Sequence, residues 1–159
     1  MANNQFKGKQ NNRNGGYQNN WSNEPKRLPE GYLVGGYYYQ PDESDKPVLR
    51  KEYILGYPVK IAGSLAERDR NLNKSSQIRK YYDYCIRIRD LISSGRKYEE
   101  VESEFYRLAN FVSYAESRKL VTPLFVEFIE KNIENIHNNE DFNAFVKHFE
   151  AVVAHLKEK

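Results

Sequence analysis

The sequence contains few of the residues that build cross-linked or catalytic sites. It has one cysteine, Cys85, so an intramolecular disulfide framework is excluded. Its three histidines, His137, His148 and His155, have no metal-ligand spacing with a cysteine or a carboxylate. We expect the histidines at the surface or partly packed, and Cys85 as a buried structural thiol. The sequence therefore predicts no enzyme, no metal site and no cofactor.

Long apolar runs are also absent. No run approaches the roughly 18 residues that a membrane span requires, and the start of the chain lacks the apolar segment of a secretory signal. Residues 1–27 contain eight Asn, three Gln and almost no aliphatic side chain, so they cannot bury enough apolar area to offset the entropy of ordering. We predict a disordered basic tail over 1–27 on a cytoplasmic protein without membrane contact.

The net charge of +3 conceals a segregation along the chain. Residues 58–97 carry ten Lys and Arg against four Asp and Glu, and residues 98–159 carry seven against twelve. Such asymmetry favours contact with a polyanion through one surface and with proteins through another.

Residues 28–57 have the pattern of an arm rather than of a helix. Two β-prone runs, "LPEGYLVGGYYYQ" and "VLRKEYILGYP", flank the loop "PDESDKP", which predicts a hairpin or an extended segment. An isolated hairpin is only marginally stable. We therefore expect this arm to dock on the helical body or on a neighbouring subunit, and its tyrosine-rich composition motivates the hypothesis that it holds a neighbour.

From residue 58 onward the apolar residues recur with helical spacing. The pattern predicts a weak helix over 58–72, interrupted by Gly63, and a second helix that begins at an Asn73, Ser75 or Ser76 cap and ends at Ser94. Three more helices are expected over 98–119, from Pro123 behind a Thr122 cap, and after residues 138–139. The fold class is thus all-α: a small bundle of four to five helices over 58–159, preceded by the tail and the arm.

The stretch "NKSSQIRKYY" places cations near the start of the second helix. A helix N-terminus carries partial positive charge, so cations there are normally disfavoured. At about 100° per residue, one arc opposite the apolar stripe collects Arg79, Lys80, Asp83, Arg87 and Asp90. Free helix amides and a row of cations are the groups that hold phosphates.

This pattern predicts a face that binds a nucleic-acid backbone. Ser75, Ser76 and Gln77 are expected to hydrogen-bond phosphate or ribose hydroxyls, and the arc supplies charge. On the next helix, a line through Arg107, Tyr114 and Arg118 is expected to add a second contact, since aromatic rings stack on bases. The face residues derived this way are Ser75, Ser76, Gln77, Arg79, Lys80, Arg87, Arg107, Tyr114 and Arg118.

Three segments resemble the small subunit of the type III-A CRISPR Csm effector complex. They are "LNKSSQIRKYY" at 72–82, "FVSYAESRKL" at 111–120 and "FNAFVKHFEAVVAHLK" at 142–157. Their order and spacing also agree with the family, and together they span about residues 58–159. The chain departs from the family pattern at Ser117, where the family usually has Gly, and at His155, where it usually has Tyr.

The resemblance implies a noncatalytic helical subunit, present in several copies, that lines the path of guide RNA (crRNA) and target RNA. It is expected to help sense their pairing in antiviral defence. Implied partners are the large polymerase-like subunit and the repeated backbone subunit. By motif, Lys74, Gln77, Arg79 and Lys80 face RNA, and Arg118 and Lys119 contact it.

Charge alone leaves an alternative open. The same basic face would serve a helical protein–protein adaptor with an acidic partner. A helical nuclease is the least favoured, because no histidine follows an arginine at the spacing that HEPN-type ribonucleases need.

Overall fold

The computed structural model describes residues 26–43 and 46–157. Within these residues the chain forms a short hairpin, one 3-10 helix and five α-helices, which confirms the predicted all-α bundle. The elements are β1 (Tyr38–Tyr39), β2 (Val48–Leu49), η1 (Lys51–Tyr53), α1 (Tyr57–Leu65), α2 (Ser75–Ser93), α3 (Tyr98–Ser117), α4 (Pro123–Glu134) and α5 (Asn139–Ala154). Except for Lys26 and Arg27, the predicted disordered tail lies outside the described residues.

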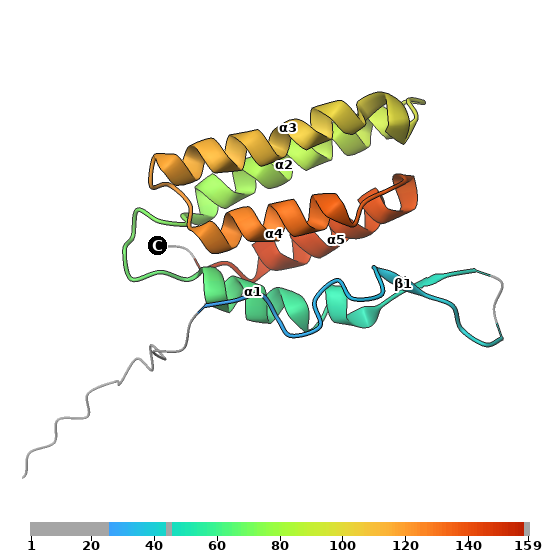
Figure 1. Ribbon diagram of the computed structural model, residues 1–159, viewed down its shortest axis with the longest axis horizontal. Helices are drawn as coiled ribbons and strands as arrows, with labels where there is room; N and C mark the ends of the chain where they lie inside the picture. Colours follow the sequence, from blue (N-terminus) through green and yellow to red (C-terminus); the bar gives the residue numbers. More distant parts are fainter. Residues whose placement is uncertain (1–25, 44–45, 158–159) are drawn as a thin grey trace, which may run out of the picture.

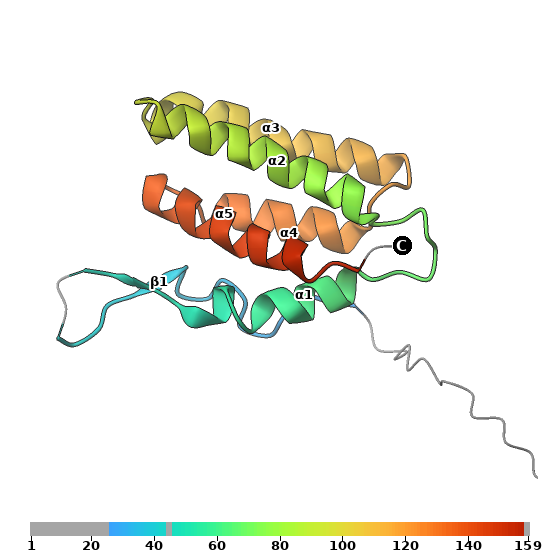
Figure 2. The same ribbon diagram turned by 180° about the vertical axis from the view of Figure 1, so that it is seen from behind.

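The helices lie in three layers. Helices α2 and α3 form one layer, α4 and α5 form the next, and α1 lies with the arm on the far side of α4 and α5 (Figures 1 and 2). The packed pairs are α2 with α3, α2 with α5, α3 with α4, and α1 with α5. The helical pair α4/α5 is therefore covered on both sides, whereas the outer side of α2/α3 is left open.

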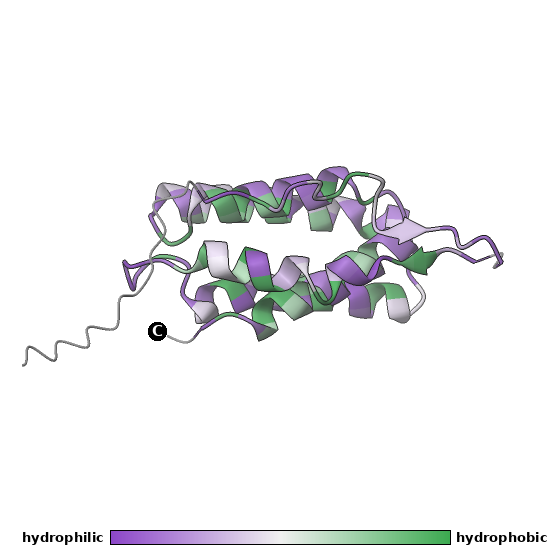
Figure 3. Ribbon diagram, turned by 90° about the horizontal axis from the view of Figure 1, so that it is seen from below, coloured by the Kyte–Doolittle hydropathy of each residue, from purple (hydrophilic) through white to green (hydrophobic). Residues whose placement is uncertain are grey.

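The predicted apolar stripes form the core. Hydrophobic and hydrophilic segments alternate along the helices in Figure 3, as expected for amphipathic helices. On α3, six apolar residues that recur at alternating steps of three and four, from Tyr98 to Ala115, are all buried. At the centre, six fully buried phenylalanines make a network of ring contacts: Phe105, Phe125, Phe128, Phe142, Phe145 and Phe149.

The first helix is shorter than the sequence predicted. Helix α1 ends at Leu65, and Ala66 is extended, with ψ 125°. The prediction of a helix to residue 72 was therefore wrong by almost two turns. Residues 66–70, "AERDR", provide no apolar group at helical spacing, so continued helix would bury nothing.

The arm docks on the chain's own helical body. Its hairpin pairs only Tyr38 with Leu49 and Tyr39 with Val48, which is shorter than the two β-prone runs suggested. Residues 30–35 form turns instead, and Gly31, Leu33 and Gly35 have left-handed φ values. Tyr37 and Tyr53 are each 1% exposed, so the arm contributes to the core.

A buried polar network fastens the arm to α4 and α5. The His148 Nδ1–H donates to the Tyr53 carbonyl at 2.6 Å, so Nε2 carries no proton and accepts from the Tyr32 hydroxyl at 2.6 Å. Asn132 Nδ2 donates to the same hydroxyl at 2.9 Å, and Tyr37 donates to Asn132 Oδ1 at 2.7 Å. His148 is 0% exposed, so the prediction of a surface or partly packed histidine was wrong. Helical period alone places His148 beside the apolar stripe of α5. It does not show that the arm, which is distant in sequence, covers this histidine.

This network predicts a specific loss of stability in acid. Burial lowers the pKa of His148 from its usual value of 6.5 to about 4. Between these values the unfolded chain binds the proton and the folded chain does not, so the free energy of unfolding falls as pH falls, by up to about 3 kcal/mol from this group. Urea unfolding at about pH 7 and about pH 4.5 measures the loss.

The matched comparison is His148→Gln with His155→Gln. The first variant is less stable at neutral pH but loses the His148 share of the acid dependence, while the second, at the exposed C-cap of α5, keeps the wild-type pH curve. An equal acid loss in wild type and His148→Gln would contradict the assignment of this share to His148.

Candidate functional site: a cationic groove on α2

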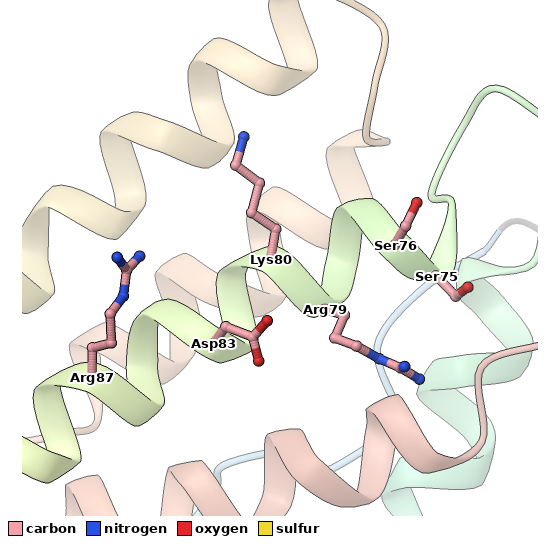
Figure 4. Close-up of a pocket in the computed structure, with 6 residues that line it drawn as sticks. All are labelled: Ser75, Ser76, Arg79, Lys80, Asp83 and Arg87. Carbon is pink, nitrogen blue, oxygen red and sulfur yellow. The ribbon is translucent and has the colours of Figure 1, made fainter.

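Six residues on the outer side of α2 line an open groove of about 540 Å³: Ser75, Ser76, Arg79, Lys80, Asp83 and Arg87. In Figure 4, Lys80 and Arg87 point to one side of the helix, toward α3, and Arg79 points to the other. Five of these six residues belong to the RNA-facing set predicted from sequence. The sixth, Asp83, lies on the arc of this helix that the sequence predicted opposite its apolar side.

The groove holds three cations and one carboxylate. Within residues 26–43 and 46–157, neither Arg79 nor Lys80 forms an ion pair. The Arg87 guanidinium lies over the Tyr84 ring, 5.5 Å from its centroid. Two exposed cations without a carboxylate partner retain their hydration and counterions, and a polyanion can replace both.

The start of α2 differs from the prediction in a way that matters for this groove. Its N-cap is Lys74, with no side-chain capping bond, rather than Asn73, Ser75 or Ser76. At α5, in contrast, the Asn138 side chain accepts from the Asp141 amide, and at α3 the Glu100 carboxylate accepts from the Lys97 amide. Ser75 and Ser76 lie in the first turn of α2, and no side chain of the described residues accepts a hydrogen bond from the first-turn amides. The groove therefore begins at hydrogen-bond donors that are available to an oxygen ligand.

Asn73 is instead the residue that positions this helix start. It is 3% exposed and has a left-handed φ of 50°. Its Nδ2 donates to the Leu65 carbonyl and to Thr122 Oγ1, and its Oδ1 accepts from the Thr122 amide. Its own amide donates to the Leu120 carbonyl. One side chain thus joins the end of α1, the start of α2 and the start of α4.

The same contact brings the C-terminus of α3 to the start of α2. Because Asn73 bonds Leu120, the turn containing Arg118 and Lys119 lies at the same end of the bundle as Lys74. Lys119 takes the left-handed C′ position, φ 58°, and the Leu120 amide donates to the Ala115 carbonyl.

The departure at Ser117 leaves the α3 end helical. Ser117 is still part of α3, and its hydroxyl donates to the Tyr114 carbonyl. The residue that uses the left-handed conformation is Lys119, so glycine is not needed at position 117.

Four other predicted residues, Gln77, Arg107, Tyr114 and Arg118, already have partners within the chain. Gln77 donates to the Tyr81 hydroxyl at 2.6 Å. Arg107 pairs with Glu104 at 3.0 Å, so a carboxylate already offsets its charge. Arg107 also lies over the Phe111 ring, and Arg118 lies over the Tyr114 ring and donates to its hydroxyl. Sequence reasoning did not select Tyr84, although it precedes Arg87 by three residues on the same helix. Phe111 lies on the predicted line from Arg107 to Arg118 but was not counted among the site residues.

The described residues offer little for catalysis or metal binding. They contain no group of three His, Cys, Asp or Glu that could hold a metal ion. Burial raises the pKa of the Cys85 thiol far above its usual range. His155 is exposed at the C-cap of α5 whereas His148 is internal, so the two histidines do not share an environment. None of the described helices is both long and apolar enough to cross a membrane.

Comparison with known protein families gives a match over most of the chain. The family described as Csm2 Type III-A matches residues 55–158, which is more than half of the chain and includes α1 to α5. Neither the curated proteins nor the solved structures include one that matches.

The Asn73 contacts predict a large effect from a small substitution. Asn73→Ala leaves the Thr122 amide and the Leu65 carbonyl without these partners, and Ala is less favourable than Asn at this positive φ, so we expect a loss of about 2–4 kcal/mol in the free energy of unfolding. Asn71→Ala is the matched control, because within the described residues Asn71 forms its hydrogen bond through its backbone amide, which donates to Asp69 Oδ1 and is kept in the variant, so the free energy of unfolding should change by less than about 0.5 kcal/mol. Chemical denaturation measures both, and equal stabilities for the two variants would contradict the role given to Asn73.

Proposed function

The chain belongs to the Csm2 type III-A family and so is a subunit of a type III-A CRISPR complex, and we propose that it is a noncatalytic subunit that binds RNA along the α2 groove. The observation that carries the proposal is the combination at one helix start: an uncapped set of amides, two serine hydroxyls, and Arg79 and Lys80 without ion-pair partners. These groups match the oxygens and charge of a phosphate backbone.

The groove chemistry suits RNA of any sequence. Ammonium, guanidinium, hydroxyl and amide groups contact phosphates and riboses, and such contacts set position without reading bases. A subunit that lines a guide RNA and its target must accept every guide sequence. We therefore propose that the groove follows a strand of the guide–target path and contributes to sensing whether the two strands pair.

The proposed setting is a cytoplasmic ribonucleoprotein. The partners would be crRNA, target RNA, the large polymerase-like subunit, the repeated backbone subunit and further copies of this chain. The family's place in a type III-A complex supports these partners. The open outer side of α2 and α3 supports RNA contact there, because no other element of the described chain covers it (Figures 1 and 2).

A protein partner is the alternative that the groove also fits. The same cations would pair with an acidic segment, and exposed glutamates are present on α4 at positions 127, 130 and 134. We favour RNA because a row of cations beside uncapped amides matches phosphate more fully than it matches isolated carboxylates.

Charge reversal in the groove tests the proposal. The full chain should bind single-stranded RNA with a strong salt dependence, and Arg79→Glu combined with Lys80→Glu should reduce the slope of log K against log salt by about 1.4, since each lost phosphate contact removes about 0.7. Fluorescence anisotropy with a labelled oligonucleotide at several salt concentrations measures the slope.

The control has the same change in charge elsewhere. Lys51→Glu combined with Lys60→Glu alters two exposed lysines on η1 and α1 and should leave the slope close to wild type. If both double variants change the slope equally, the groove is not the RNA site. If RNA does not bind at all while an acidic protein partner does, the adaptor function replaces the proposal.

A further inference from the structure

Beside the groove, arginines and aromatic rings alternate across α2 and α3. The contacts form a continuous series: Arg87 lies 5.5 Å from the Tyr84 centroid, Tyr84 meets Phe111 edge to face at 5.4 Å, and Arg107 lies 5.3 Å from the Phe111 centroid. One turn further along α3, Arg118 lies 5.7 Å from the Tyr114 centroid. We call Tyr84, Arg87, Arg107, Phe111, Tyr114 and Arg118 the arginine–aromatic row.

Two of the three rings of this row are exposed to solvent. Tyr114 is 62% exposed and Phe111 is 37% exposed, although neighbouring positions on α3 bury their apolar side chains completely. A guanidinium against one face of an exposed ring restricts the ring before a ligand binds. Stacking a planar group on this ring therefore costs less conformational entropy than stacking on a mobile ring. The row is therefore built as a platform for planar groups.

The charge around the row indicates which planar group fits. Arg87 belongs both to the row and to the groove, and Lys80 points from the groove toward α3 (Figure 4). Three guanidinium groups face the rings, and Glu104 is the carboxylate that pairs with one of them. A protein face with aromatic side chains would satisfy the rings but leave Arg87 and Arg118 without an anion. An RNA base attached to a phosphate satisfies both.

We propose that the arginine–aromatic row is a stacking site for unpaired RNA bases, adjacent to the phosphate groove. This inference rests on the proposed function and adds to it that the RNA bound here is single-stranded. A base can stack on a ring or a guanidinium plane only when it has left its own stack and its partner strand. The groove alone binds a backbone whether or not the strand is paired, so the row makes the chain prefer single-stranded RNA.

Three RNA ligands separate stacking from charge. They are a single-stranded oligonucleotide, an oligomer of the same length with abasic residues, and a duplex that contains the same strand. Wild type should bind the single strand best and the other two more weakly. Tyr114→Ala should weaken single-strand binding about tenfold while leaving the salt slope and the affinity for the abasic oligomer unchanged.

Matched variants on the same helix make the result specific. Tyr106→Ala removes a tyrosine that is 45% exposed but lies outside the row, so it should bind all three ligands as wild type does. Tyr114→Trp should retain single-strand binding. In a Trp21→Phe background the emission of that new tryptophan should be quenched by the single strand and not by the abasic oligomer.

The outcomes distinguish this inference from the proposed function. If Tyr114→Ala and Phe111→Ala bind the single strand as wild type does while the Arg79/Lys80 double variant loses it, the groove binds RNA and the stacking site is overturned. If the alanine variants lose contact with a protein subunit but not with RNA, the row is a protein interface and the inference fails. Loss of the preference for single strand over abasic oligomer only in the row variants supports it.

Discussion

The hydrogen bonds of Asn73 fix the geometry on which the candidate site depends. A buried amide is costly unless each of its polar atoms finds a partner. The Asn73 side chain meets this requirement only when the end of α1, the start of α2 and the start of α4 converge on it. Its backbone amide adds the turn after α3 through Leu120. Four chain segments are thereby held at one end of the bundle, and the cations of α2 and of the α3 terminus come to the same place.

The N-terminal arm covers apolar side chains of α4 and α5. The α4/α5 layer has apolar residues on more than one side, and the arm and α1 cover the side that α2 and α3 leave open. A segment so rich in tyrosine brings hydroxyls into the core, and each needs a partner. Asn132 and His148 supply partners to Tyr32 and Tyr37. The arm begins before residues 55–158, which match the family, and it packs on the α4/α5 layer, on the side away from α2 and α3 (Figures 1 and 2).

Elements governed by local pattern were predictable from sequence, and those governed by distant contacts were not. The α3 stripe and the basic arc of α2 follow from helical period, and the groove residues agree with that arc. The cap of α2 could not be predicted, because Asn73 is a good capping residue whose side chain is used by Thr122, 49 positions away. The buried state of His148 depends on Tyr32 and Tyr53, more than 90 positions earlier. Single-residue properties gave no sign of either contact.

The start of α2 shows how a local energetic cost and a binding function can share one cause. A helix without a side-chain cap, with no acidic residue in its first turn and cations shortly after it, gives up about 1 kcal/mol or more of helix stability. The Asn73 contacts and the buried α2 stripe compensate for that loss, so the chain does not need a cap there. What the missing cap leaves is a set of unbonded amides beside Arg79 and Lys80. In the proposed function, a phosphate that binds them would supply the acceptor and the negative charge that the sequence omits, so ligand binding would also stabilise the helix.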